Sequence, residues 1–212
     1  MEARRLWLAA ALFALLAAAG AFGLDATVAR WTAGGADGSF WDIGTRWLDL
    51  LTLKEISNFL LGALLLLAAA GLLAVSRTRT LGWPLLYLGL VQSVSTVAAD
   101  LSKPQLGRLR PFEAAAPGGA DTWFVGANSF PSGHVAFYAG LFLPLTVLVP
   151  RWTAAWLLPP LFIAAARMLE NDHYLSDVAA SLALAAALAA ALAPLAHRAR
   201  SGTVEARGRA GL

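Results

Sequence analysis

The chain has 212 residues, of which 58% are hydrophobic and only 14% are charged, and its net charge at pH 7 is +3. Soluble domains carry about a quarter charged residues, so this deficit points to lipid as the surroundings, and the absence of cysteine excludes disulfides and thiolate chemistry. The basic residues form short clusters between apolar runs, as in membrane-protein loops, which excludes a nucleic-acid-binding face.

Apolar runs that reach or approach the roughly 20 residues needed to cross a bilayer follow one another along the chain. They are Leu6–Leu24, Ile56–Val75, Thr80–Ala99, Val135–Val149, Trp152–Ala166 and Val178–Ala196. We therefore predict an all-α, polytopic bundle of six transmembrane helices that forms one domain over residues 1–212. The fourth and fifth runs are long enough only if they include Pro131–His134 and Arg167–Glu170, so we expect those polar residues at membrane depth, where polar groups are costly and usually functional.

The first run also has features of a signal peptide, because a charged start precedes it and small residues follow from Ala17. It is long enough to span, so we expect it to be retained. Its cleavage would leave the orientation of the other five helices unchanged.

The distribution of basic residues predicts the orientation of the bundle. If both termini are cytoplasmic, the cytoplasmic segments, including a basic tail at about 197–212, hold more Lys and Arg than the other side, by a small margin. The margin widens if Lys103, Arg110 and Arg167 belong to a site. We therefore expect a multi-pass protein of the inner (cytoplasmic) membrane whose two longer loops face the periplasm or exterior.

Three polar clusters fall on that non-cytoplasmic side, at the ends of predicted helices three to six. In Lys103–Pro111, basic residues oppose the positive-inside bias. Pro131–His134 opens the fourth helix, where free N–H groups and the helix dipole can bind an anion. In Arg167–Asp177, His173 and Asp177 are four residues apart, so on a helix they share a face, and a carboxylate beside an imidazole leaves its other nitrogen as nucleophile or base.

Each cluster taken alone has a simpler structural explanation. The first is a juxtamembrane loop, the second an ordinary helix cap, and the third a solvated hairpin with an incidental ion pair. Three such clusters on one side of the membrane, each with groups that suit an anion, favour a single anion-binding site instead.

At these clusters the chain resembles the type 2 phosphatidic acid phosphatase superfamily, whose signatures are Lys-x6-Arg-Pro, Pro-Ser-Gly-His and Arg-x5-His-x3-Asp. They match, in order, Lys103…Arg110-Pro111, Pro131-Ser132-Gly133-His134 and Arg167…His173…Asp177. Ala166 stands where the family often has Ser, a position with no known chemical role.

The resemblance implies a lipid phosphatase that forms a phosphohistidine on His173, oriented by Asp177, with His134 as general acid and then base. It also implies that the phosphoryl oxygens are bound by the remaining matched residues, Lys103, Arg110, Ser132, Gly133 and Arg167. Phosphoryl transfer needs mainly positioning and charge stabilisation, so fixed cations can replace a metal. No carboxylate cluster accompanies the two histidines, and we expect neither a metal nor another cofactor.

Alternative functions use the same residues. A lipid phosphotransferase would pass the phosphoryl group to an acceptor other than water, whereas a non-enzymatic binder or transporter of anionic lipid would need the cations but not the histidines. Vanadium haloperoxidases share the motifs but are soluble in character. Candidate substrates are undecaprenyl diphosphate, which many short bacterial family members use, phosphatidylglycerophosphate, phosphatidate and a lipid A phosphate. The expected partners are this lipid and the bilayer, with no nucleic acid, and nothing indicates an oligomeric state.

Overall fold

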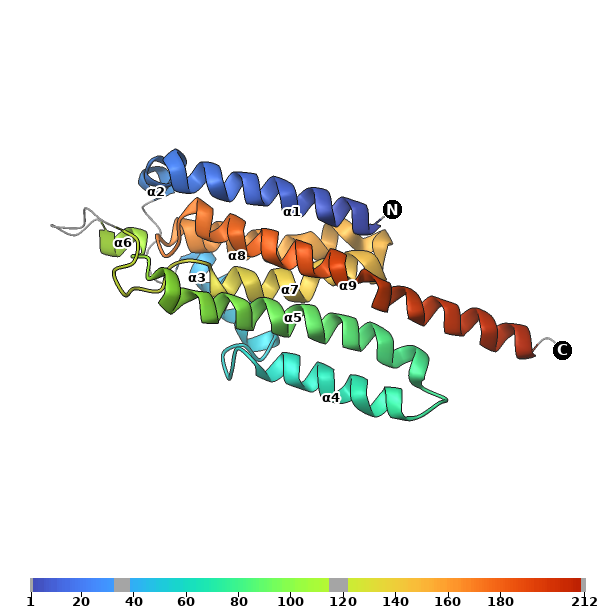
Figure 1. Cartoon of the computed structure of the whole chain (residues 1–212). Helices are drawn as coiled ribbons and strands as arrows, with labels where there is room; N and C mark the ends of the chain where they lie inside the picture. Colours follow the sequence, from blue (N-terminus) through green and yellow to red (C-terminus); the bar gives the residue numbers. More distant parts are fainter. Residues whose placement is uncertain (1, 33–38, 115–121, 211–212) are drawn as a thin grey trace.

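The computed structural model describes residues 2–32, 39–114 and 122–210, and within these ranges the regular structure is entirely helical (Figure 1). The elements are α1 (Glu2–Ala19), η1 (Gly20–Leu24, one π-helical turn), α2 (Asp25–Thr32), α3 (Phe40–Leu51), α4 (Leu60–Ala74), α5 (Arg79–Leu106), α6 (Pro111–Ala114), α7 (Gly133–Leu148), η2 (Pro150–Trp152), α8 (Thr153–Leu169) and α9 (Leu175–Ala210). The predicted all-α class is confirmed.

Among the described residues, four helical stretches are long and apolar enough to cross a membrane: Ala3–Thr32, Arg79–Ala114, Pro150–Leu169 and Leu175–Arg198. Two further apolar helices, α4 and α7, are shorter. Each of the six apolar runs coincides with one of these helices, as predicted, whereas a count of six spans stays a prediction. α4 is short because Leu53, with a φ of 60°, belongs to a turn that delays the start of the helix to Leu60.

The core of the bundle lies between α5, α7 and α9, with α1 packed along α9 and α4 along α5 (Figure 1). α9 presents a buried row of alanines, including Ala185, Ala186 and Ala189, to its neighbours. Small residues let helix backbones approach closely, which is how helices associate in a membrane. The hydroxyl of Tyr87 on α5 donates to the carbonyl of Ala189 at 2.7 Å and joins two of the central helices.

Helix α3 differs from the others because it is amphipathic and packs mainly against α8. Its Trp41 ring lies 5.1 Å from that of Phe162, between ring centroids. Ile43, Trp47 and Leu50, which share one face of the helix, are exposed. A helix of this kind lies along a membrane interface, with polar residues on its other side.

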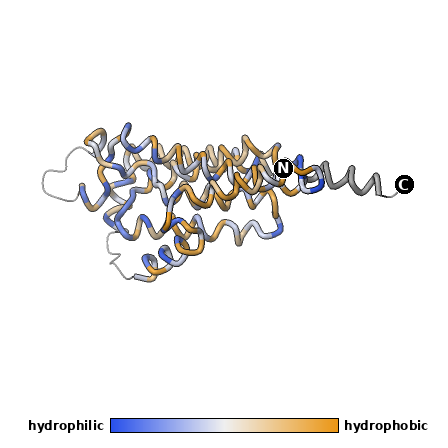
Figure 2. The backbone as a smooth tube through the Cα atoms, turned by 90° about the horizontal axis from the view of Figure 1, so that it is seen from below, coloured by the Kyte–Doolittle hydropathy of each residue, from blue (hydrophilic) through white to orange (hydrophobic). Residues whose placement is uncertain are grey.

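Hydrophobic residues follow the helices along their length, and hydrophilic residues gather toward the ends of the bundle (Figure 2). At one of these ends α5 and α8 finish, and α7 and α9 begin. All three polar clusters of the sequence lie there.

Candidate active site

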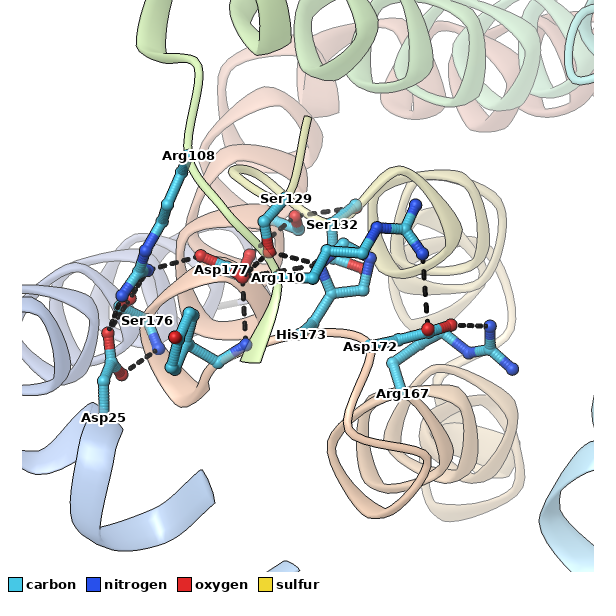
Figure 3. Close-up of polar contacts among 12 residues, drawn as sticks. Asp25, Arg108, Arg110, Ser129, Ser132, Arg167, Asp172, His173, Ser176 and Asp177 are labelled. Atoms are coloured by element: carbon cyan, nitrogen blue, oxygen red, sulfur yellow. Dashed lines mark hydrogen bonds and ion pairs between the residues drawn. The ribbon is translucent and has the colours of Figure 1, made fainter. Parts of the chain in front are cut away.

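The polar clusters are joined to one another by backbone hydrogen bonds as well as by side chains. The amide of Ser132, just before α7, donates to the carbonyl of Asp177 in α9 at 3.2 Å. The hydroxyl of Ser181, one turn further along α9, donates to the carbonyl of Ser132 at 2.8 Å. The amide of Phe112 donates to the carbonyl of Asn171 at 3.3 Å. Segments from three parts of the chain are thereby fixed around a common centre (Figure 3).

His173 and Asp177 form a buried pair at this centre. The Nδ1 atom of His173 lies 3.4 Å from Oδ2 of Asp177. The same oxygen accepts 2.6 Å from the hydroxyl of Ser129 and 2.9 Å from the amide of Tyr174. The hydrogen bond from the Tyr174 amide is half of a capping box, because Asp177 is in the first turn of α9 and its side chain reaches back to Tyr174, the residue before the helix. With Nδ1 turned toward the carboxylate, the free nitrogen for chemistry is Nε2.

Burial gives His173 the protonation state that a nucleophile needs. Its side chain is only 5% exposed, between the end of α8 and the start of α9. This burial lowers the pKa of His173, although hydrogen bonding and charge from Asp177 act in the opposite direction. The imidazole is therefore neutral at physiological pH, with its lone pair available.

Ser132 and Gly133 form the start of α7, next to Lys103. Ser132 has the extended backbone of a cap residue, but its side chain makes no capping hydrogen bond and its Oγ atom is buried without a partner among the described residues. A Cβ atom on Gly133 would lie 2.8 Å from Nζ of Lys103, so only glycine allows the ammonium group so close to this helix end. The side chain of Ser132 therefore does not cap α7, and its hydroxyl is available to bind a substrate oxygen.

Arg110 and Arg167 come from different clusters and meet at one carboxylate. Nη1 of Arg110 lies 3.2 Å from Oδ1 of Asp172, and Nη1 of Arg167 lies 2.7 Å from its Oδ2 (Figure 3). Arg167 also pairs with Glu170. One carboxylate thus bridges two guanidinium groups, each of which offers a fork of donors that matches a phosphoryl group equally well.

His134, the second residue of α7, is engaged through Nε2 with two side chains that no motif contains. Nζ of Lys54 lies 2.9 Å from this nitrogen, and Oδ2 of Asp49 lies 3.1 Å from it. Asp49 is in the last turn of α3, and Lys54 is in the turn that follows. The predicted general acid is therefore held from outside the three clusters.

A second group that the sequence did not predict is a buried ion network behind Asp177. Arg108 donates to Oδ1 of Asp177 at 2.5 Å and to Oδ2 of Asp25 at 2.6 Å. Both Arg108 and Asp25 also bond to Ser176, at 2.6 Å between Arg108 and the serine hydroxyl. The guanidinium lies between two aromatic rings, with its carbon 4.3 Å from the centroid of Trp123 and 4.0 Å from that of Tyr174.

Each of the eight predicted site residues thus lies at this end of the bundle, either in direct contact with another of them or joined to one by a shared carboxylate or by the backbone. His173 contacts Asp177, Lys103 lies over Gly133, and the two arginines share Asp172. Within the residues that the structure describes, no group of three or more His, Cys, Asp or Glu side chains is placed to hold a metal ion.

Comparison with known proteins agrees with the motifs. The profile of the PAP2 superfamily matches residues 80–201, which include α7, α8 and nearly all of α5. The chain belongs to the PAP2 superfamily. Among the curated relatives of this PAP2 protein, a lipid A 1-phosphatase of Rhizobium johnstonii is 32% identical over 111 residues, which are 49% of this chain and 44% of that protein.

A lipid A 1-phosphatase of Rhizobium etli is 33% identical over 105 residues, or 48% of this chain and 45% of that protein. The chain therefore spans less than half the length of the curated relatives it matches. A transmembrane PAP2 type phosphatidylglycerolphosphate phosphatase from Bacillus subtilis has a crystal structure that matches 91% of this chain and 94% of its own, with a TM-score of 0.55 and 21% sequence identity. That similarity shows a common membrane fold.

Proposed function

We propose that this PAP2 protein is a membrane lipid phosphatase that works through a phosphohistidine on His173, without a metal. The observation that carries the proposal is the arrangement around this side chain. The buried imidazole is backed by Asp177, and Ser132, Arg110 and Arg167 lie around it at the same end of the bundle (Figure 3). Binding an anion needs only the cations, whereas a positioned, buried nucleophile suits bond breaking.

The reaction has two half-reactions. In the first, Nε2 of His173 bonds to phosphorus, the bond from phosphorus to the leaving oxygen breaks, and His134 gives that oxygen a proton. In the second, water attacks phosphorus, His134 takes the proton, and the phosphorus–nitrogen bond breaks to release phosphate. Lys103, Arg110 and Arg167 stabilise the charge on the phosphoryl oxygens in both steps, which is the main demand of phosphoryl transfer.

The substrate class is a lipid that bears a terminal phosphate or diphosphate. The names of the two Rhizobium relatives favour a lipid A phosphate. The other candidate substrates are undecaprenyl diphosphate, phosphatidylglycerophosphate and phosphatidate. The three clusters share the end of the bundle that the distribution of basic residues predicts to face the periplasm, so we propose that the substrate enters from the outer leaflet of the inner membrane.

The test is phosphate release by the purified protein from this panel of lipids in excess chelator. We expect release from at least one lipid, and an acid-labile phosphoenzyme during turnover. His173→Ala should abolish both. His197→Ala, the same change at an exposed position in the C-terminal half of α9, should retain both.

Loss of activity in chelator with recovery in magnesium would overturn the metal-independent mechanism. A phosphoenzyme in His173→Ala would overturn the choice of nucleophile. A lipid phosphotransferase is recognised in the same assay, because the labelled phosphoryl group would then appear on an added acceptor rather than as inorganic phosphate.

A further inference from the structure

Nε2 of His134 has two partners of opposite character. A carboxylate oxygen of Asp49 lies 3.1 Å away and an ammonium nitrogen of Lys54 lies 2.9 Å away. Carboxylate oxygens only accept hydrogen bonds, and an ammonium group only donates them. Asp49 therefore stabilises the state in which Nε2 carries a proton, and Lys54 stabilises the state in which Nε2 is bare.

Both partners are held in place. The second oxygen of Asp49 accepts 2.7 Å from the hydroxyl of Tyr138, which lies one turn after His134 on α7. The hydroxyl of Thr52 lies 3.2 Å from the same Tyr138 oxygen. The hydrogen bonds therefore link the end of α3 to the first turns of α7, and they fix the carboxylate on the histidine.

Lys54 is only 8% exposed and lies 3.9 Å from the Asp49 carboxylate. Burial lowers its pKa; the nearby Asp49 works against this, while Arg167 and Lys103 add to it. The pKa of Asp49 is also below its usual value, because hydrogen bonds and charge from its neighbours outweigh the opposite effect of burial. These two opposite charges face one ring nitrogen in a setting where water screens them little.

We propose that Asp49 and Lys54 are positioning residues that shift the proton affinity of His134 in opposite directions, so that each partner supports one of its two proton transfers. This inference rests on the proposed function, in which His134 gives a proton to the leaving oxygen and later takes one from water. A group that performs both transfers works best when neither protonation state is strongly preferred. Asp49 raises the proton affinity, Lys54 lowers it, and the proton count balances over the two steps.

The two partners should therefore act on different half-reactions. Without Asp49, His134 is a weaker base, so breakdown of the phosphohistidine should slow. Without Lys54, His134 is a weaker acid, so formation of the phosphohistidine should slow, most of all from an alkyl phosphate, whose leaving alkoxide needs a proton. An aryl phosphate leaves well without protonation and should be affected much less.

The experiment measures the two half-reactions separately in single-turnover assays of the full-length protein. The variants are Asp49→Asn and Lys54→Met, which keep the shape or length of each side chain. The substrates are phosphatidate and an aryl phosphate. Proton transfer contributes about 10²–10⁴ to such rates, so we expect each variant to slow its own step by about 10- to 100-fold. Asp49→Asn should accumulate phosphoenzyme, and Lys54→Met should not.

Glu55→Gln is the matched control, because Glu55 is an exposed neighbour in the same turn, and it should leave both steps unchanged. Tyr138→Phe keeps the carboxylate but frees one of its oxygens, so it should slow phosphoenzyme breakdown less than Asp49→Asn does. Tyr138→Phe also provides the test if Asp49→Asn fails to fold. Asp49→Glu, the conservative variant, should restore part of the breakdown rate.

Equal slowing of both half-reactions in Asp49→Asn would show that the residue only ties α3 to α7, and would overturn the proposal. Equal slowing for both substrates in Lys54→Met would show that Lys54 binds the phosphoryl group instead. If the unaltered protein itself forms no phosphoenzyme and releases no phosphate from any lipid, the proposed function fails instead, which is a different result.

Discussion

Replacement of Arg108 by methionine should both destabilise the protein and disable His173. The side chains of Arg108, Asp25 and Asp177 are 3%, 7% and 0% exposed, and the arginine donates to both carboxylates. Arg108→Met leaves two buried carboxylates without their common cation. Removing one partner of a buried ion pair costs about 3–5 kcal/mol, and the two pairs share one arginine, so their costs do not simply add.

The effect on His173 follows from the same contacts. Oδ1 of Asp177 is held by Arg108, and Oδ2 faces the imidazole. A carboxylate that loses one of these bonds is free to turn or to gain a proton, and it no longer orients the nucleophile. We expect phosphoenzyme formation in Arg108→Met to fall by at least 100-fold. Arg108→Lys keeps the charge but cannot donate to both carboxylates as the guanidinium group does. Its rate of phosphoenzyme formation should lie between those of Arg108→Met and the unaltered protein.

The assay compares apparent melting temperatures in one detergent at one scan rate, because unfolding of such proteins is commonly irreversible. Arg46→Met is the matched control, because its ion pair with Asp42 is 3.0 Å long but the arginine is 74% exposed. Exposed pairs contribute about 0–1 kcal/mol, so this variant should melt close to the unaltered protein. Adding Asp25→Asn to Arg108→Met should recover part of the melting temperature without recovering activity. If Arg108→Met melts and reacts like the control, the network has no role in stability or catalysis.

Four further predictions test the site and its orientation. Gly133→Ala should raise KM roughly tenfold and change kcat less, since its Cβ would lie 2.8 Å from Nζ of Lys103 and push the ammonium group away; an unchanged KM would contradict this. Burial lowers the pKa of His173, so phosphoenzyme formation from an aryl phosphate should lose rate only below the usual histidine value of about 6.5. The same shift means that the unfolded chain binds the proton more readily, so the contribution of this group to stability is complete above about pH 6.5 and is lost as the pH falls; a melting temperature that rises on acidification would contradict it. A single cysteine at Phe124, which is exposed beside the site, should react with an impermeant thiol reagent in intact cells. One at Arg77, which precedes α5 and so lies at the other end of that helix from the site, should not react, and the reverse pattern would invert the topology.

The helices could be predicted from the sequence, because an apolar run is a local property of the chain. The meeting of the motifs at one end of the bundle could also be predicted, because successive helices run in opposite directions and the motifs lie at helix ends on the same side. The predicted contact between His173 and Asp177 is present. The reason differs from the one expected, because His173 precedes α9 and the two residues do not share a helical face. The spans are harder to count, because α4 is shorter than its apolar run and both α4 and α7 are shorter than a bilayer requires.

The supporting residues could not be predicted because their meaning depends on contacts across the fold. Asp25 directly follows the first apolar run and looks like the boundary of a span, yet it is buried against Ser176 of α9. Arg108 falls inside the spacer of the first signature, where no residue type is specified. Asp49 lies in an amphipathic helix and Lys54 in the turn after it, and nothing in the sequence near either residue indicates that the fold brings both to His134.

The charge balance of the site bears on the kind of substrate it suits. Among the residues that the structure describes at this end of the bundle, Arg108 is paired with Asp25 and Asp177, and the other cations of the site are paired as well. Their pairs are Lys103–Asp100 at 2.9 Å, Arg110–Asp172 at 3.2 Å, Arg167–Asp172 at 2.7 Å and Lys54–Asp49 at 3.9 Å. These carboxylates keep the cations ordered and offset the cost of burying them. A substrate must therefore compete with these carboxylates for the guanidinium N–H donors of Arg110 and Arg167. A terminal phosphate, with two negative charges and three free oxygens, competes better than a phosphodiester, which has one charge and two free oxygens. The pairing itself thus favours lipids that end in a phosphate over the diesters that make up most of the surrounding membrane.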